Sequence, residues 1–158
     1  MSRSMSEIEE LKRLQIEKEA PTQVSEIMTR DVVATAPEQS VQEAITLVAR
    51  HRFRHLLVVT GDQRLAGVIS DRDLLRFMIR GPQWGSAAVS EVMRTDPITV
   101  SPDTLLSIAI TKMLDRRINC LPVIDADGKV AGILTSTDLL KTLHKLQEWI
   151  EQEDTVKI

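Results

Sequence analysis

The chain contains a single cysteine, Cys120, which excludes an intrachain disulfide and a zinc site built from several thiolates. A protein held together without disulfides is typical of the reducing interior of the cell, so we expect a cytoplasmic location. No run of about 18 apolar residues is present, and the N-terminus is charged where a secretion signal needs apolar residues. We therefore expect neither a membrane-spanning segment nor export.

Aromatic residues are also scarce, with two Phe, two Trp and no Tyr. The chain has 20 basic residues and 23 acidic ones, so basic residues are not in excess. Nucleic-acid binding needs a basic surface, and single strands need stacking aromatics, so the composition argues against both. The three histidines show no metal-ligand spacing, and no Gly-rich loop of the ATP-hydrolysing type occurs. A chain of 158 residues can close a core without help, so we expect no metal and no required cofactor.

What the chain does contain is an internal repeat at an offset of 65 residues, without a gap. VSEIMTRD at 24–31 aligns with VSEVMRTD at 89–96, and one register holds from there to the Asp-Leu-Leu triplets that begin at Asp73 and Asp138. Such a match indicates a duplicated structural unit.

Each unit carries the same succession of predicted elements. Apolar residues recur at i, i+3, i+4 and i+7 in one segment, which predicts a helix with one apolar face. Two short apolar runs follow in each unit and predict strands paired as a hairpin, at 56–59 with 65–69 and at 121–124 with 130–134. A further helix comes next, so the order is strand, helix, strand, strand, helix. This order defines an α+β fold, and we expect the two units to pack sheet to sheet about a pseudo-twofold axis.

The repeat also divides the chain. We expect an N-terminal helical segment at 1–23, a first repeat at 24–88, a second repeat with an extended C-terminal helix at 89–153, and a tail at 154–158. The terminal helices carry apolar stripes, a thin one at Ile8, Leu11 and Leu14 and a stronger one at Leu139, Leu143, Leu146 and Ile150. The second stripe packs either on a partner subunit or on its own domain.

The most specific motif is G-x-x-[ST]-x-x-D, which occurs at Gly67–Asp73 and again at Gly132–Asp138. Each copy follows a predicted strand and opens a predicted helix. A hydroxyl at a helix N-terminus lies beside unpaired backbone N–H groups, where phosphate oxygens are stabilised. A carboxylate one turn later can accept hydrogen bonds from both cis hydroxyls of a ribose.

With the strand sequences HLLVV and CLPVI, these motifs resemble those of the cystathionine-β-synthase (CBS) domain in its tandem form, the Bateman module. The resemblance covers Val24 to Leu143. It implies a regulatory module without catalytic residues, which binds an adenine nucleotide (AMP, ADP or ATP) in the cleft between the repeats. It also implies a homodimer that signals to a separate effector protein.

The same resemblance implies the site residues. Asp73 and Asp138 hold the ribose, the residues beside them lie near the phosphates, and an apolar slot across the pseudo-twofold receives the base. The first site then comprises Arg54, His55, Ser70, Arg72, Asp73, Ser101 and Ile118. The second site comprises Ala36, Phe53, Asn119, Cys120, Thr135, Thr137 and Asp138.

A second interpretation of the motif stays open, because Ser70 to Asp73 and Thr135 to Asp138 are also complete helix capping boxes. The alternative function is therefore a structural dimerisation or interaction module with vestigial sites, and S-adenosylmethionine is an alternative ligand. An enzyme is disfavoured, since no candidate base or nucleophile is evident. Cys120 starts an apolar strand and is expected to be a buried thiol.

The two halves differ in charge. Residues 50–80 hold seven Arg and three Asp, whereas the aligned residues 115–145 hold five basic and four acidic side chains. Three arginines of the first half fall where phosphate is expected and have no arginine counterpart: Arg54, Arg72 and Arg76. Solvated surface is the other explanation of such residues. We predict that the first site prefers di- or triphosphates and that the second prefers a monophosphate, a nucleoside or no ligand.

Overall fold

Two small sheets form the centre of the molecule. The computed structural model describes residues 4–155 and contains one sheet of three strands in the order β1 (Ala34–Thr35), β2 (His55–Val59) and β3 (Leu65–Ser70). The other sheet pairs β4 (Cys120–Ile124) with β5 (Val130–Thr135). Both hairpins are antiparallel, whereas β1 runs parallel to β2. The predicted hairpin strands are confirmed to within one residue at each end.

The strand expected at the start of the second unit is reduced to a single bridge. In the first unit Ala34 pairs with Leu57, whereas in the second, within the described residues, the contact is a single parallel bridge between Val100 and Val123. The position equivalent to Leu57 is Pro122. Because proline has no backbone N–H, it cannot donate to an incoming strand, and the ladder stops there.

The helices follow the predicted pattern. Each unit places one helix between its strands and one after its hairpin: α2 (Val41–His51) and α3 (Asp71–Met78) in the first, α4 (Leu106–Arg116) and α5 (Ser136–Thr155) in the second. The capping box predicted for α2 is present, since the Glu43 N–H donates to Ser40 Oγ at 3.2 Å. Both α2 and α4 end at an arginine in the left-handed conformation, Arg52 (φ 56°) and Arg117 (φ 52°), which stops each helix at the equivalent position.

Each repeat has its own hydrophobic core, and each core is completed by the other repeat. The 3-10 turn at Val24–Glu26 starts the first repeat in sequence, but Val24 packs with Val100 and Leu121 of the second. Conversely, Val89 in the turn at Val89–Glu91 packs into the first core. A spatial unit therefore combines residues from both sides of the boundary that the sequence repeat defines.

A third cluster joins the two sheets. Leu57 and Val68 of one sheet pack against Cys120 and Ile133 of the other, and all four are buried. The predicted sheet-to-sheet packing of two pseudo-symmetric repeats is therefore confirmed, and it brings the ends of β3 and β5 close to the opposite repeat.

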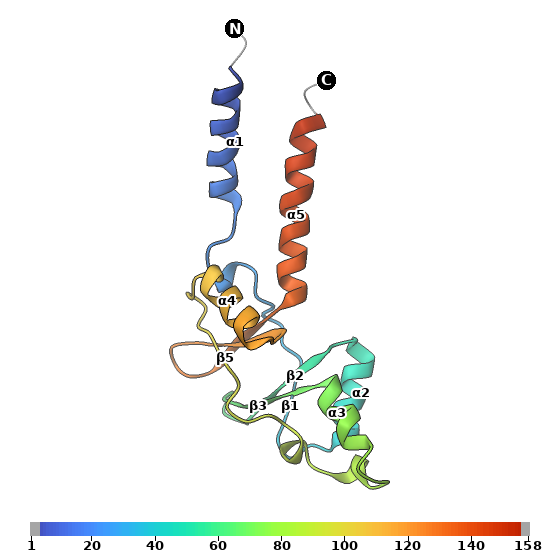
Figure 1. Ribbon diagram of the computed structural model, residues 1–158. Coiled ribbons are helices and arrows are strands. Elements are labelled where there is room, and N and C mark those ends of the chain that lie inside the picture. Colours follow the sequence, from blue (N-terminus) through green and yellow to red (C-terminus); the bar gives the residue numbers. More distant parts are fainter. Residues whose placement is uncertain (1–3, 156–158) are drawn as a thin grey trace.

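The terminal helices α1 (Met5–Glu19) and α5 project from the same side of the body (Figure 1). Helix α1 buries none of its residues, and Leu14 is 56% exposed. In α5, Leu139 packs against the second core, whereas Leu143 is 59% exposed. The C-terminal stripe therefore packs on its own domain at its beginning, through Leu139. Helix α5 runs to Thr155, and most of the expected tail at 154–158 lies outside the described residues. Across residues 4–155, none of the helices is both long and apolar enough to span a membrane.

Candidate functional site

Two cavities lie where the repeats meet, one beside each G-x-x-[ST]-x-x-D motif. The first has a volume of about 560 Å³ and the second about 350 Å³, which lies in the range of small-molecule sites. The first cavity includes the start of α3 and the chain before α4, and the second includes the start of α5 and the chain before α2. Each cavity is therefore built from both repeats.

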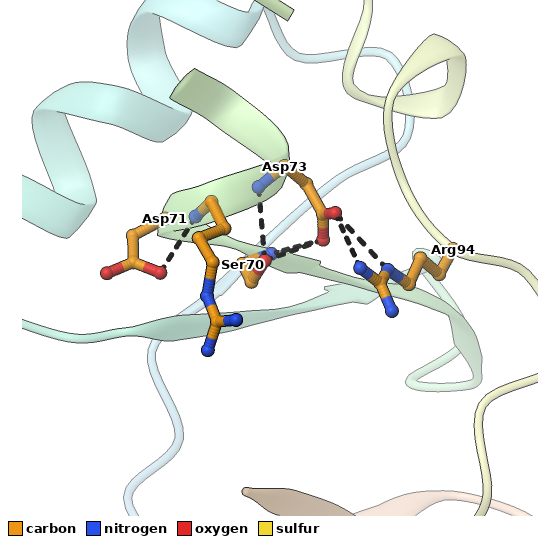
Figure 2. A network of polar contacts seen from close by, with 5 residues as sticks. Ser70, Asp71, Asp73 and Arg94 are labelled. Carbon is orange, nitrogen blue, oxygen red and sulfur yellow. Dashed lines mark hydrogen bonds and ion pairs between the residues drawn. The ribbon is translucent and has the colours of Figure 1, made fainter. Parts of the chain in front are cut away.

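At the first cavity, Ser70 and Asp73 form the capping box that begins α3 (Figure 2). The Ser70 hydroxyl and backbone N–H donate to Asp73 Oδ2 at 2.7 and 3.1 Å, and the Asp73 N–H donates to Ser70 Oγ at 3.1 Å. The second carboxylate oxygen, Oδ1, accepts hydrogen bonds from Arg94 Nε at 3.2 Å and from Arg94 Nη2 at 2.9 Å. Both oxygens of Asp73 thus accept hydrogen bonds from the protein itself.

The second cavity repeats this arrangement with a weaker donor. The Thr135 hydroxyl and N–H donate to Asp138 Oδ2 at 2.9 and 2.7 Å, which forms the second predicted capping box. Asp138 Oδ1 accepts a hydrogen bond from the Thr29 hydroxyl at 2.9 Å. Thr29 and Arg94 are equivalent positions of the repeat, so a neutral hydroxyl stands where the first cavity has a guanidinium.

Two glycines allow these donors to reach the carboxylates. Arg94 forms a two-bond backbone bridge with Val68, and Thr29 forms the same bridge with Ile133. A Cβ on Gly67 would lie 2.6 Å from the Arg94 carbonyl oxygen, and a Cβ on Gly132 would lie 2.7 Å from that of Thr29. Only glycine permits so close an approach, which explains the first residue of the motif.

The electrostatic state of the site follows from burial and hydrogen bonding. Burial alone would raise the pKa of Asp73, but the hydrogen bonds from Arg94 and Ser70 outweigh it and lower the pKa, so the carboxyl is charged at neutral pH. Burial lowers the pKa of His55, so its imidazole is neutral at pH 7. Burial raises the pKa of Cys120 to about 11, which keeps it a thiol rather than a nucleophilic thiolate.

The structure gathers most of the predicted site residues around the two cavities. Lining the first are Arg54, His55, Ser70, Arg72, Asp73 and Ile118. Lining the second are Phe53, Asn119, Thr135, Thr137 and Asp138. Arg54, His55 and Asn119 line both cavities, because they lie at the pseudo-twofold between them.

Three predicted residues lie elsewhere. Cys120, expected at the second site, lines the first cavity, because β4 starts beside the pseudo-twofold. Ala36 and Ser101, both in the described part of the chain, lie outside both cavities. Each sits in the turn before a helix, where the Ala36 N–H donates to Gln39 and the Ser101 hydroxyl donates to Asp103. Residues three positions earlier line the cavities instead, Val33 in the second and Ile98 in the first.

Sequence reasoning missed several polar lining residues, among them Arg94 and Arg117 in the first cavity and Thr29 and Arg52 in the second. Arg52 and Arg117 are aligned by the 65-residue repeat and are the same residue type, and this identity could have pointed to both of them. Nothing in the sequence shows that the segments around Thr29 and Arg94 cross to the opposite repeat.

The two cavities differ in the kind of basic group more than in net charge. Five arginines and three aspartates line the first cavity, whereas two arginines, one lysine and one aspartate line the second, so the formal excess is two positive charges in both. Guanidinium groups bind phosphate through two parallel hydrogen bonds.

The cavities also differ in an apolar lining residue. In the second cavity, Phe53 is 38% exposed and stacks on His51 with ring centroids 5.3 Å apart, whereas Ile118 takes the equivalent place in the first.

Two pseudo-symmetric α+β repeats, packed sheet to sheet with a capping-box aspartate at the start of each final helix, define a tandem pair of duplicated domains. The chain belongs to the CBS domain family, whose model matches residues 24–80 and 89–145. The predicted family is therefore confirmed.

Among sequence relatives, an uncharacterized protein of Methanopyrus kandleri is 29% identical over 131 residues, which is 82% of this chain and 67% of that protein. An inosine-5′-monophosphate dehydrogenase of Korarchaeum cryptofilum is 34% identical over 110 residues, which is 70% of this chain but 22% of the enzyme. A homoserine O-acetyltransferase of Methanohalobium evestigatum is 30% identical over 78% of this chain and 24% of its own length. The chain thus spans less than a quarter of each of these two enzymes.

Several solved structures share this fold. A Vibrio cholerae protein named for acetoin utilization (AcuB) has a TM-score of 0.76 at 29% identity, over 82% of this chain and 96% of that one. CBSX2 in complex with AMP has a TM-score of 0.72 at 30% identity, over 80% and 99%. The CBS domain pair of protein MJ0100, in complex with 5′-methylthioadenosine and S-adenosyl-L-methionine, has a TM-score of 0.71 at 25% identity, over 79% and 98%.

Proposed function

We propose that this chain is a ligand-sensing regulatory module that binds adenosine-containing ligands, foremost AMP, ADP or ATP, in its two inter-repeat cavities. The observation that carries this proposal is the construction of each cavity: a capping-box carboxylate from one repeat faces apolar and basic residues from the other. The AMP bound to CBSX2 and the adenosine ligands of the MJ0100 pair support the ligand class.

The proposed roles follow the chemistry of each group. Asp73 and Asp138 accept hydrogen bonds from ribose hydroxyls, and Ser70 and Thr135 stand at helix starts where phosphate is stabilised. The base rests between the apolar residues of the opposite repeat, near Ile98 and Ile118 in the first cavity. In the second cavity it rests near Val33 and Phe53, where an aromatic face is available for stacking.

The arginines support a difference between the sites. Arg54, Arg72 and Arg76 line the first cavity, and an extended phosphate chain can accept hydrogen bonds from several guanidinium groups at once. The second cavity has Thr137 and Lys141 at the positions of Arg72 and Arg76. The first site therefore prefers di- and triphosphates, and the second prefers a monophosphate or a nucleoside.

The module acts on a partner rather than on its ligand. Cys120, the one cysteine of the sequence, lines the first cavity, and its raised pKa keeps it a thiol, which argues against covalent catalysis through this residue. A ligand shifts the packing of the two repeats only to the extent that it binds one arrangement better than another. We propose that a separate effector protein responds to this change in the packing of the two repeats.

A homodimer is the proposed assembly. Leu75 on α3 and Leu140 on α5 occupy equivalent positions of the repeat and are 59% and 64% exposed. Ile79 is 85% exposed beside Leu75 at the end of α3. Apolar side chains exposed on equivalent helices provide a self-complementary surface for a second copy of the chain.

A purely structural module is the second candidate, and one observation favours it. Both capping boxes are complete within the protein itself, so the aspartates have a structural role in starting α3 and α5. On this account, Asp73→Ala and Asp138→Ala weaken folding without changing any response to a ligand.

A thermal-shift screen of AMP, ADP, ATP and S-adenosylmethionine separates the two candidates. A ligand that binds the folded chain raises its melting temperature in proportion to the logarithm of its concentration above Kd. The sensor account predicts stabilisation by at least one adenine nucleotide, and no shift at millimolar concentration of any of them contradicts it. Conversion of ATP to a product by the purified chain would instead establish an enzyme.

A further inference from the structure

Arg94 contacts the carboxylate to which the proposed function assigns the ribose. Its Nε and Nη2 lie 3.2 and 2.9 Å from Asp73 Oδ1. The side chain of Asp73 is 11% exposed and that of Arg94 is 63% exposed, so the carboxylate is enclosed while the guanidinium borders solvent. Figure 2 shows Arg94 reaching Asp73 from the opposite side to Ser70.

The acceptor positions of Asp73 are therefore occupied by groups of the protein itself. A carboxylate oxygen has two lone-pair positions, and two Arg94 donors converge on Oδ1 while two Ser70 donors converge on Oδ2. A ribose hydroxyl that binds Asp73 must displace one of these donors. The Ser70 donors belong to the start of α3, whereas Arg94 is tethered only by its own flexible side chain, so Arg94 is displaced more easily.

The fate of the displaced guanidinium depends on the ligand. Arg54, Arg72 and Arg76 line the same cavity, so a phosphate group bound there lies within a cluster of guanidinium groups that Arg94 can join. A phosphate then replaces Asp73 as the anionic partner of Arg94. An uncharged nucleoside offers no such replacement, so its binding breaks the ion pair and leaves Arg94 without an anionic partner.

The second cavity lacks this arrangement. Thr29 donates one neutral hydrogen bond to Asp138 Oδ1 at 2.9 Å, which leaves that oxygen a second lone pair for a ribose hydroxyl. Displacing Thr29 breaks no ion pair, and Thr29 brings no charge to a phosphate.

We propose that Arg94 is a specificity-determining residue of the first cavity, which closes Asp73 to unphosphorylated nucleosides and changes partner to the phosphate when a phosphorylated ligand binds. This inference rests on the proposed nucleotide function. The selectivity for phosphate then comes from the change of the Arg94 partner from Asp73 to the phosphate, and not from the positive charge of Arg94 alone.

Isothermal titration calorimetry with ADP and adenosine tests it. The Asp138→Asn variant removes the carboxylate of the second cavity, so its titration measures the first cavity. Arg94→Thr, which introduces the residue found at the equivalent position Thr29, is added to this variant, and the two proteins are compared. Arg94→Met, which preserves the side-chain length, replaces Arg94→Thr in case the threonine variant folds poorly. We expect ADP to bind roughly tenfold more weakly after either substitution and adenosine to bind roughly threefold to tenfold more tightly, since the ion pair no longer has to break. The reciprocal Thr29→Arg in the Asp73→Asn background should weaken adenosine binding at the second cavity.

The gain in adenosine affinity is the deciding result. If ADP binding weakens while adenosine binding stays unchanged or weakens, Arg94 acts only as a positive charge and the inference is wrong, although the proposed function stands. If adenosine and ADP bind the wild-type chain but neither binds the first cavity, the inference also fails. If no adenine ligand binds the folded wild-type chain at all, the proposed function fails together with it.

Discussion

Arg94 and Thr29 stand 65 residues apart at equivalent positions of the two repeats, and each donates a hydrogen bond to the capping-box aspartate of the opposite repeat. The bond from Arg94 runs to Asp73, and the bond from Thr29 runs to Asp138. One duplicated framework thus holds two carboxylates in the same way, with an ion pair at one cavity and a neutral hydrogen bond at the other. This difference is the physical basis for assigning different ligand preferences to the two sites.

The close approach of the crossing segments predicts that the motif glycines are essential to stability. In Gly67→Ala the added Cβ would lie 2.6 Å from the Arg94 carbonyl oxygen, which must move and strain the two-bond bridge to Val68. We expect a loss of about 2 kcal/mol or more in the free energy of unfolding, measured by urea denaturation. Gly61→Ala is the matched control, because a Cβ there meets nothing within 4 Å, and its effect should stay within about 0.5 kcal/mol. Equal losses in the two variants would show that the approach is not as close as described.

The ion pair at the first cavity predicts a pH dependence of stability. The pKa of Asp73 is lowered from its ordinary value of 3.8, so the stabilisation by its charged form is fully present above about pH 5 and is lost as pH falls through the folded-state pKa. Asp73→Asn should cost about 1 to 2 kcal/mol at pH 7, from the weakened cap and the lost ion pair. That cost should shrink towards pH 3.

Urea unfolding at several pH values between 3 and 7 measures this dependence. Asp115→Asn, an exposed carboxyl on α4 that does not line the first cavity, controls for the general loss of a negative charge. A cost of Asp73→Asn that stays constant over the whole pH range would mean that the carboxylate contributes no charge-dependent stability.

The buried thiol gives a chemical test of the packing between the sheets. Cys120 is buried, and its raised pKa of about 11 leaves little thiolate at pH 8. Labelling by Ellman's reagent should therefore be on the order of a hundredfold slower in the folded chain than in urea. Equal labelling rates in the two states would contradict the burial of Cys120 between the two sheets.

The arginine cluster predicts a preference for longer phosphate chains at the first cavity. In an Asp138→Ala variant, which reports that cavity, ATP should bind at least about tenfold more tightly than AMP by calorimetry, because more phosphate oxygens meet guanidinium donors. Replacing Arg72 with threonine, the residue at the equivalent position of the second repeat, should reduce this ratio. Equal affinity for AMP and ATP would contradict the assignment.

Much of this architecture could be predicted because the repeat supplies each element twice. The hairpin strands and the start of α2 at Ser40 are visible as apolar runs and a capping box, which are local patterns. The second unit departs at Pro122, where a missing N–H ends the pairing with the preceding strand, and this effect was readable in the sequence but overlooked.

The lining of the cavities was harder to predict, because it depends on how the copies pack together. Val24 completes the core of the second repeat and Val89 that of the first, and this exchange carries Thr29 and Arg94 to the opposite carboxylates. A repeat shows which residues are equivalent but not which copy they contact. Ala36 and Ser101 have a different cause, because their polar groups are used in local turns three residues beyond the apolar lining.

The central claim is that both inter-repeat cavities bind adenine nucleotides through Asp73 and Asp138. Calorimetric titration of ATP and AMP into the wild-type chain, the two single aspartate-to-alanine variants and the double variant tests it most directly, with circular dichroism to confirm that each is folded. The account predicts saturable binding to the wild type, loss of one class of site in each single variant and no binding to the folded double variant. Binding to the double variant with wild-type affinity, or no binding to the folded wild-type chain, would contradict it.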